Sequence, residues 1–159
     1  MNILITGMSG TGKTTVIELL QARGFETIES DSEEWSEFKT LPGETEPGWL
    51  WREEKMHELL TRRRPGPLFV NGCVSNQAKF YPHFDHVVLF SAPTPILLER
   101  IAKRTNNRYG KSLAERQEIL GYIETVELLL RRGADREINT AEWTADEIAD
   151  QLSVLAQSS

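Results

Sequence analysis

A glycine-rich loop between an apolar run and a helical segment limits the fold of this chain more than any other feature. Residues 2–6 are dense in Ile and Leu, which is typical of a buried parallel strand. Residues 13–23 have apolar side chains at helical spacing and are followed by Gly24, a usual helix stop. Between them lies the sequence Gly7-Met8-Ser9-Gly10-Thr11-Gly12-Lys13-Thr14. A strand that passes through such a loop directly into a helix is the context of a phosphate-binding loop.

The loop is a complete Walker A sequence, and it predicts that the chain binds ATP. Successive backbone N–H groups would converge on the phosphates, and glycines would let the backbone approach closely. The helix that begins at Lys13 would add the positive end of its dipole. We expect Lys13 to reach the β- and γ-phosphates and the Thr14 hydroxyl to coordinate Mg²⁺. The predicted ATP-binding residues here are Gly7, Met8, Ser9, Gly10, Thr11, Gly12, Lys13, Thr14 and Thr15.

The rest of the pattern alternates strands with helices. Further strands are predicted at residues 25–28, 68–70, 87–90 and 136–139. Helices are predicted at residues 49–63, 96–104, 112–132 and from 144 onward, and a mobile loop at 39–48. This alternation predicts an α/β fold with three α/β/α layers, in which helices cover both faces of a five-stranded parallel sheet. The length of 159 residues fits a single domain over 1–159.

Composition excludes several classes of partner. The net charge of −6 argues against bulk nucleic acid. No apolar run approaches the roughly 20 residues of a membrane span, so no membrane partner is expected. Cys73 is the only cysteine, which rules out an internal disulfide and favours a cytoplasmic location. Both a monomer and a homodimer are compatible with the sequence.

Acidic residues follow the second predicted strand, where the phosphate site should lie. Parallel sheets carry their ligand sites at the carboxyl ends of the strands. Asp31 would therefore lie near the phosphates, hold Mg²⁺ together with Thr14, or accept a hydroxyl proton. Glu29 is the alternative candidate, and a solvated acidic loop is the alternative for both residues. The third predicted strand ends in Asn71 instead of the Asp of a Walker B strand, which disfavours an AAA-type or motor ATPase and shifts these roles toward Asp31.

The order and spacing of these features are similar to those of the small P-loop kinases of the shikimate kinase and gluconate kinase group, over nearly the whole chain. The resemblance implies the P-loop kinase fold, with three α/β/α layers and a five-stranded parallel sheet. The Asp-x-Asp motif of that group corresponds to Glu29-Ser30-Asp31, and its Phe-Arg-x-x-Glu motif to Trp51-Arg52-Glu53-Glu54-Lys55. The resemblance implies that Arg52 binds the phosphoryl acceptor, although Lys55 replaces the expected Glu. It places the acceptor-binding segment at about residues 32–64, with Asn71 also facing the acceptor.

The resemblance also implies a lid at about residues 104–115, in which Arg104 and Arg108 contact the phosphates. A solvated basic helix end is the alternative for both arginines. The turn that begins at Asn139 resembles the adenine-contacting turn of the group. Two departures argue against shikimate as the acceptor: Asn71-Gly72-Cys73 replaces a triple glycine, and residues 126–130 contain no arginine.

Together these features predict an ATP- and Mg²⁺-dependent phosphotransferase that moves the γ-phosphate of ATP to a hydroxyl group of a small molecule. Lys13, Asp31 and Arg104 are the predicted catalytic residues, and Asp31, Arg52 and Asn71 the predicted acceptor contacts. A nucleoside or nucleotide kinase, and a non-catalytic ATP-binding regulator or ATPase, remain as alternatives. Three tryptophans near the acceptor segment would either stack on a planar acceptor or form core, namely Trp35, Trp49 and Trp51.

Overall fold

The sheet of the computed structural model, which describes residues 1–104 and 110–158, is parallel and has five strands. The spatial order is β2-β5-β1-β6-β7, and every neighbouring pair runs in the same direction. These strands are β1 (Asn2–Gly7), β2 (Glu26–Glu29), β5 (Leu68–Asn71), β6 (His86–Ser91) and β7 (Arg136–Asn139). The order confirms the predicted P-loop kinase arrangement.

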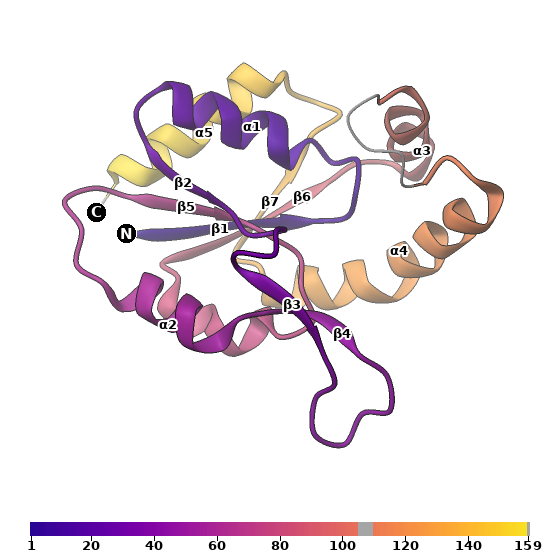
Figure 1. The fold of residues 1–159 in the computed structure, drawn as a ribbon. Helices are drawn as coiled ribbons and strands as arrows, with labels where there is room; N and C mark the ends of the chain where they lie inside the picture. The colour runs from indigo at the N-terminus through magenta and orange to yellow at the C-terminus, as the bar shows by residue number, and fades with distance from the viewer. Residues whose placement is uncertain (105–109, 159) are drawn as a thin grey trace.

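Helices cover both faces of the sheet (Figure 1). Alternate residues of β1 point to opposite faces, as its pleat requires. Ile3 and Ile5 pack in the cluster that includes α1 (Lys13–Ala22) and α5 (Ala145–Gln157). Leu4 packs on the other face, in the cluster that includes α2 (Glu53–Thr61) and the 3₁₀-helix η1 (Gln77–His83). The remaining helices are α3 (Thr94–Lys103) and α4 (Leu113–Gly133), and none of the helices in the described ranges has the length and apolarity to cross a bilayer.

Strand register collects polar residues at one edge of the sheet. Asn71, the last residue of β5, pairs with Ile5 of β1 on one side and with Glu29 of β2 on the other. On the far side of β1, Gly7 pairs with Phe90 of β6. The carboxyl ends of the central strands therefore meet where the glycine loop leaves β1.

The helix predicted at residues 49–63 is wrong in its first part. Residues 48–51 form β4 (Gly48–Trp51), which pairs antiparallel with β3 (Ser36–Lys39), and α2 starts only at Glu53. Figure 1 shows this hairpin projecting from the layered body, with residues 40–47 as its loop. Aromatic residues favour strands where they find cross-strand partners, and Trp49 lies opposite Phe38 with ring centroids 4.8 Å apart.

Trp51 fastens the hairpin to the sheet. Its side chain is 1% exposed, so the core alternative holds for this tryptophan. The indole Nε1 donates to Oγ of Ser30 at 2.8 Å, and this hydroxyl donates to the backbone oxygen of Asn71 at 2.6 Å. The backbone N–H of Trp51 donates to Oδ1 of Asn76 at 2.9 Å. The hairpin is thus joined by hydrogen bonds to the ends of β2 and β5.

Replacement of Gly72 by Ala tests this attachment. An added Cβ would lie 2.2 Å from Oγ of Ser30 and 3.2 Å from the Trp51 indole, so the buried hydrogen-bonded group must shift. We expect Gly72→Ala to lower the free energy of unfolding by about 1–3 kcal/mol, the usual cost of overpacking. Urea unfolding monitored by tryptophan fluorescence measures the change. Gly121→Ala, at a helical position with open space, is the matched control and should lose no stability; equal losses in both variants would contradict the proposed role of the contact.

Candidate active site

The glycine loop closes tightly against its neighbours. A Cβ at Gly7 would lie 2.4 Å from the backbone oxygen of Phe90, so the loop leaves β1 in direct contact with β6. Gly10 and Gly12 have φ angles of 86° and 94°, which favour glycine. Gly12 is the N-cap of α1 and offers no side-chain cap to the first N–H groups of the helix. Space around its Cα is open, so the loop and helix end form a backbone cradle that fits an anion.

Lys13 lies over this cradle. Its Nζ donates to the backbone oxygens of Gly7 and Met8, the latter at 3.1 Å. Burial of the ammonium group lowers the pKa of Lys13. The nearby carboxylates Glu29 and Asp31 raise this pKa, whereas the positive charge of Arg104 lowers it further. Two cations are therefore close enough to interact at the loop, which is the arrangement that a polyphosphate would stabilise.

Glu29, the alternative candidate to Asp31, is in hydrogen-bond contact with the predicted metal ligand Thr14. The Thr14 hydroxyl donates to Oε2 of Glu29 at 3.3 Å, and Nδ2 of Asn71 donates to the same oxygen at 2.7 Å. Partial burial of the carboxyl group raises the pKa of Glu29, while these two hydrogen bonds lower it. The pairing of β2 with β5 creates this group, because it places Glu29 beside Asn71.

Asp31 faces the hairpin. Its Oδ1 accepts a hydrogen bond from Nε1 of Trp49 at 2.8 Å. Asp31 also acts electrostatically on Lys13 and on Glu29, so both carboxylates belong to one charged group. The structure thus brings Thr14, Glu29 and Asn71 into direct contact, and it connects Asp31 to Trp49 of the predicted acceptor segment.

Asn71 carries a buried acceptor atom that needs a donor. The residue is 2% exposed, and among the described residues no group donates to its Oδ1. Because an ionised Glu29 accepts only, the amide nitrogen of Asn71 must face Glu29, which fixes Oδ1 as the unpaired atom. A buried acceptor without a partner costs free energy. Asn71 therefore fits a ligand that presents an O–H or N–H group, such as metal-bound water or an acceptor hydroxyl.

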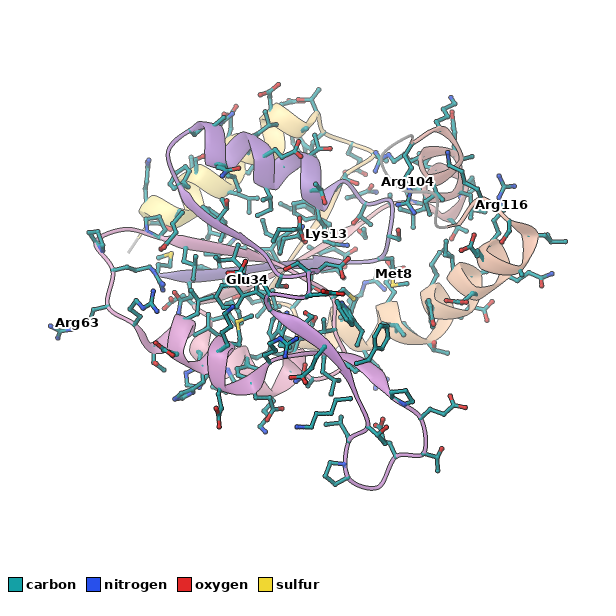
Figure 2. All side chains as sticks on the ribbon, in the orientation of Figure 1. Met8, Lys13, Glu34, Arg63, Arg104 and Arg116 are labelled. Carbon is teal, nitrogen blue, oxygen red and sulfur yellow. The ribbon has the colours of Figure 1, made fainter. Side chains whose placement is uncertain are left out.

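Two arginines one helical turn apart connect α3 to the glycine loop. Nη1 of Arg104 donates to Oγ of Ser9 at 2.9 Å, and Figure 2 shows Arg104 on the α3 side of Lys13 and Met8. Arg100, which sequence reasoning missed, donates to the backbone oxygen of Gly10 at 3.4 Å and to Oγ1 and the backbone oxygen of Thr140 at 2.8 and 3.0 Å. Arg100 thus joins the loop region to the turn that follows β7.

The other predicted site residues lie at three places. Asn139 ends β7, and its Oδ1 accepts from the backbone N–H of Ala141 at 3.0 Å, which shapes the predicted adenine turn. Arg108 lies outside the described residues. The Arg52 guanidinium donates to the backbone oxygen of Glu33 at 3.0 Å and pairs with the Glu37 carboxylate at 3.6 Å. Arg52 therefore holds residues 33–37 of the predicted acceptor segment.

Comparisons with known proteins identify the family and the fold of the chain. The chain belongs to the AAA_18 family, described as an AAA domain, whose model matches residues 3–121. The expectation that the chain is not an AAA-type or motor ATPase stays a prediction. The matched region includes the glycine loop, the two carboxylates Glu29 and Asp31, and the β3–β4 hairpin. No curated protein matches the chain by sequence.

Solved structures of small P-loop kinases share the fold. Shikimate kinase from Acinetobacter baumannii in complex with shikimate is 22% identical, with a TM-score of 0.66 and coverage of 97% of this chain and 91% of that one. A gluconokinase from Sinorhizobium meliloti is also 22% identical, with a TM-score of 0.59 and coverage of 98% and 93%. Deoxyadenosine kinase from M. mycoides with bound dATP is 15% identical, with a TM-score of 0.63 and coverage of 99% and 100%. The predicted resemblance to the shikimate and gluconate kinase group is confirmed.

The pKa of Glu29 gives a prediction for the nucleotide-free protein. A carboxyl group whose pKa is raised by folding stabilises the folded state below its unfolded value of about 4.3, and this contribution is lost as pH rises through the folded pKa. In Glu29→Gln the loss cannot occur. We expect the free energy of unfolding of the variant to increase relative to wild type as pH rises through this window. Urea unfolding at a series of pH values measures the difference, and a difference that falls with pH would contradict the assignment.

Proposed function

We propose that the protein is an ATP-dependent kinase that phosphorylates a hydroxyl group of a small molecule. The observation that carries the proposal is the meeting of three groups at one edge of the sheet. These are the glycine cradle with Lys13, the Thr14–Glu29–Asn71 cluster, and the Arg104 side chain on Ser9. Phosphoryl transfer requires an anion cradle, carboxylates, and cations such as Lys13 and Arg104.

ATP and Mg²⁺ fit the residues present. The backbone N–H groups of residues 7–15 and Lys13 would hold the phosphates, and Asn139 would shape the adenine site. Thr14 and a carboxylate would hold the metal, which neutralises phosphate charge when bound. Glu29 is the carboxylate that contacts Thr14, so we propose it for the metal site beside Asp31. The buried Oδ1 of Asn71 supports the assignment, because it can accept a hydrogen bond from metal-bound water or from the acceptor.

Catalysis would consist mainly of positioning and charge stabilisation. The acceptor hydroxyl oxygen forms a bond to the γ-phosphorus, the bond from this phosphorus to the β–γ bridging oxygen breaks, and ADP leaves with the electron pair. Asp31 takes the hydroxyl proton, because its carboxylate lies between Lys13 and the hairpin. Lys13 and Arg104 stabilise the transferring group. Arg52 holds residues 33–37 in position and so orders the acceptor side.

Replacement of Lys13 tests whether this site catalyses phosphoryl transfer. Lys13→Ala removes the ammonium group that contacts the cradle, and we expect ADP formation to fall by about a hundredfold or more, the scale of a lost electrostatic stabiliser. ATP binding, measured by calorimetry, should weaken in parallel. Lys103→Ala removes an exposed lysine that pairs with Glu99, and it serves as the control. Near-normal ADP formation by folded Lys13→Ala would contradict the proposed phosphate site at Lys13, whereas tight ATP binding by wild type without turnover of any acceptor would favour a binding-only regulator.

The two carboxylates can be distinguished by their response to Mg²⁺. Asp31→Asn should lower kcat by about a hundredfold even at saturating Mg²⁺, the scale of a lost general base, with little change in ATP binding. Glu29→Gln should instead raise the Mg²⁺ concentration needed for half-maximal rate, since the amide is a poorer metal ligand. The measurement is ADP release across a Mg²⁺ titration. If the two variants exchange these effects, then Asp31 holds the metal and Glu29 takes the proton.

A further inference from the structure

The acceptor side of the site carries the entire charge excess of the chain. Residues 29–55 contain nine acids and three bases, so their net charge equals the −6 of the whole sequence, and the remainder is balanced. The acids are Glu29, Asp31, Glu33, Glu34, Glu37, Glu44, Glu46, Glu53 and Glu54, and the bases are Lys39, Arg52 and Lys55. All of these residues lie in the described part of the chain, and the segment includes the whole β3–β4 hairpin.

The bases at the foot of the hairpin are already compensated. Arg52 is held by the backbone oxygen of Glu33 and the carboxylate of Glu37. Nζ of Lys55 donates to the backbone oxygen of Glu34 at 2.9 Å, lies 3.6 Å from its carboxylate, and sits 4.6 Å from the centre of the Trp35 ring. Figure 2 places Glu34 at the base of the hairpin. An acceptor carboxylate or phosphate would have to break these contacts to reach Arg52 or Lys55, whereas Lys39, the third base of the segment, lies exposed at the end of β3.

A second observation, the unpaired oxygen of a buried amide, points to a ligand that donates hydrogen bonds. Oδ1 of Asn71 is buried and has no partner among the described residues, and its amide nitrogen is fixed by Glu29. Such an atom accepts from an O–H, an N–H or an ammonium group, and it repels a carboxylate. The unpaired oxygen at the end of β5 and the acidic hairpin therefore both disfavour an anionic acceptor.

The hairpin also presents an aromatic surface next to a carboxylate. Phe38 is 72% exposed and its ring contacts that of Trp49, whose indole N–H is bonded to Asp31. Aromatic faces beside carboxylates recognise cations, because the ring quadrupole and the negative charge both attract them.

We propose that the acceptor is a hydroxyl compound that carries an ammonium group, such as an amino alcohol or an amino sugar. The proposal rests on the proposed kinase function and specifies the acceptor of the same transfer. The ammonium group would bind between the acids and the Phe38–Trp49 rings, which leaves the hydroxyl group to reach Asp31 and Asn71. Acidic residues on the open side of a site also raise the local concentration of a cation and repel anions.

Acceptors of matched size and different charge test the proposal. ADP release is measured with glucosamine, glucose and gluconate, with 3-amino-1,2-propanediol, glycerol and glycerate, and with adenosine. We expect the highest kcat/KM within each series for the ammonium compound, and this value should fall as ionic strength rises. Faster turnover of gluconate or glycerate, or turnover of a neutral acceptor that salt does not change, would overturn the proposal while leaving the kinase function intact.

Neutralising one acid of the hairpin loop gives a matched comparison. Glu46→Gln should raise the KM of the ammonium acceptor by about twofold, as expected for one unit charge at ~10 Å in water. The kcat should not change, because Glu46 lies in the exposed loop. Glu124→Gln makes the same charge change on the exposed surface of α4 and should leave KM unchanged. Equal shifts in both variants would mean that only the total charge matters, and would contradict a site on the hairpin.

A measurement without turnover separates this proposal from the kinase function. Tryptophan fluorescence of Trp143→Phe, which lacks the 46%-exposed tryptophan outside the hairpin, is quenched with Cs⁺ and with iodide, each normalised to free tryptophan amide. We expect the normalised constant to be larger for Cs⁺, and Glu46→Gln to reduce the difference. If iodide quenches as well as Cs⁺, the surface does not select cations and the proposal fails. Selection of Cs⁺ with no turnover of any acceptor would instead contradict the kinase function alone.

Discussion

The parallel pairing of β1 with both β5 and β6 is the constraint on which the site depends. It places Gly7 against the backbone of Phe90, where a side chain has no room, and it places Asn71 beside both Ile5 and Glu29. The loop that leaves β1 must then turn through glycines with positive φ before α1 can begin. This geometry brings together the glycine cradle, Lys13 and the carboxylate cluster, because parallel strands end at the same edge of the sheet.

The hairpin depends on that edge in turn. The Trp51 indole, the Ser30 hydroxyl and the backbone of Asn71 form one buried hydrogen-bonded chain, and Gly72 leaves just enough space for it. The residues proposed to hold the metal and those proposed to face the acceptor are therefore attached to each other directly. A shift at the end of β5 would therefore move both sets of residues, which would disturb the geometry of the proposed transfer.

Two particular differences between expectation and structure have physical explanations. Residues 49–51 look helical because they precede a genuine helix without a break, but the cross-strand contact of Trp49 with Phe38 and the burial of Trp51 favour a strand. The sequence favoured Asp31 over Glu29 as the metal ligand, because sequence separation does not show which of the two carboxylates contacts Thr14. Only strand pairing puts Glu29 beside Asn71 and Thr14, while the Trp49 indole engages Asp31.

The sequence by itself determined the phosphate loop, the order of the five parallel strands along the chain and the acidic character of residues 29–55, since these depend on local composition and short-range spacing. Only the tertiary structure decided which carboxylate contacts Thr14, that Arg100 joins the loop region to Thr140, and that Arg52 is engaged by Glu33 and Glu37. These contacts join residues that are far apart in the sequence. Their existence depends on register and packing, which no local pattern of residues specifies.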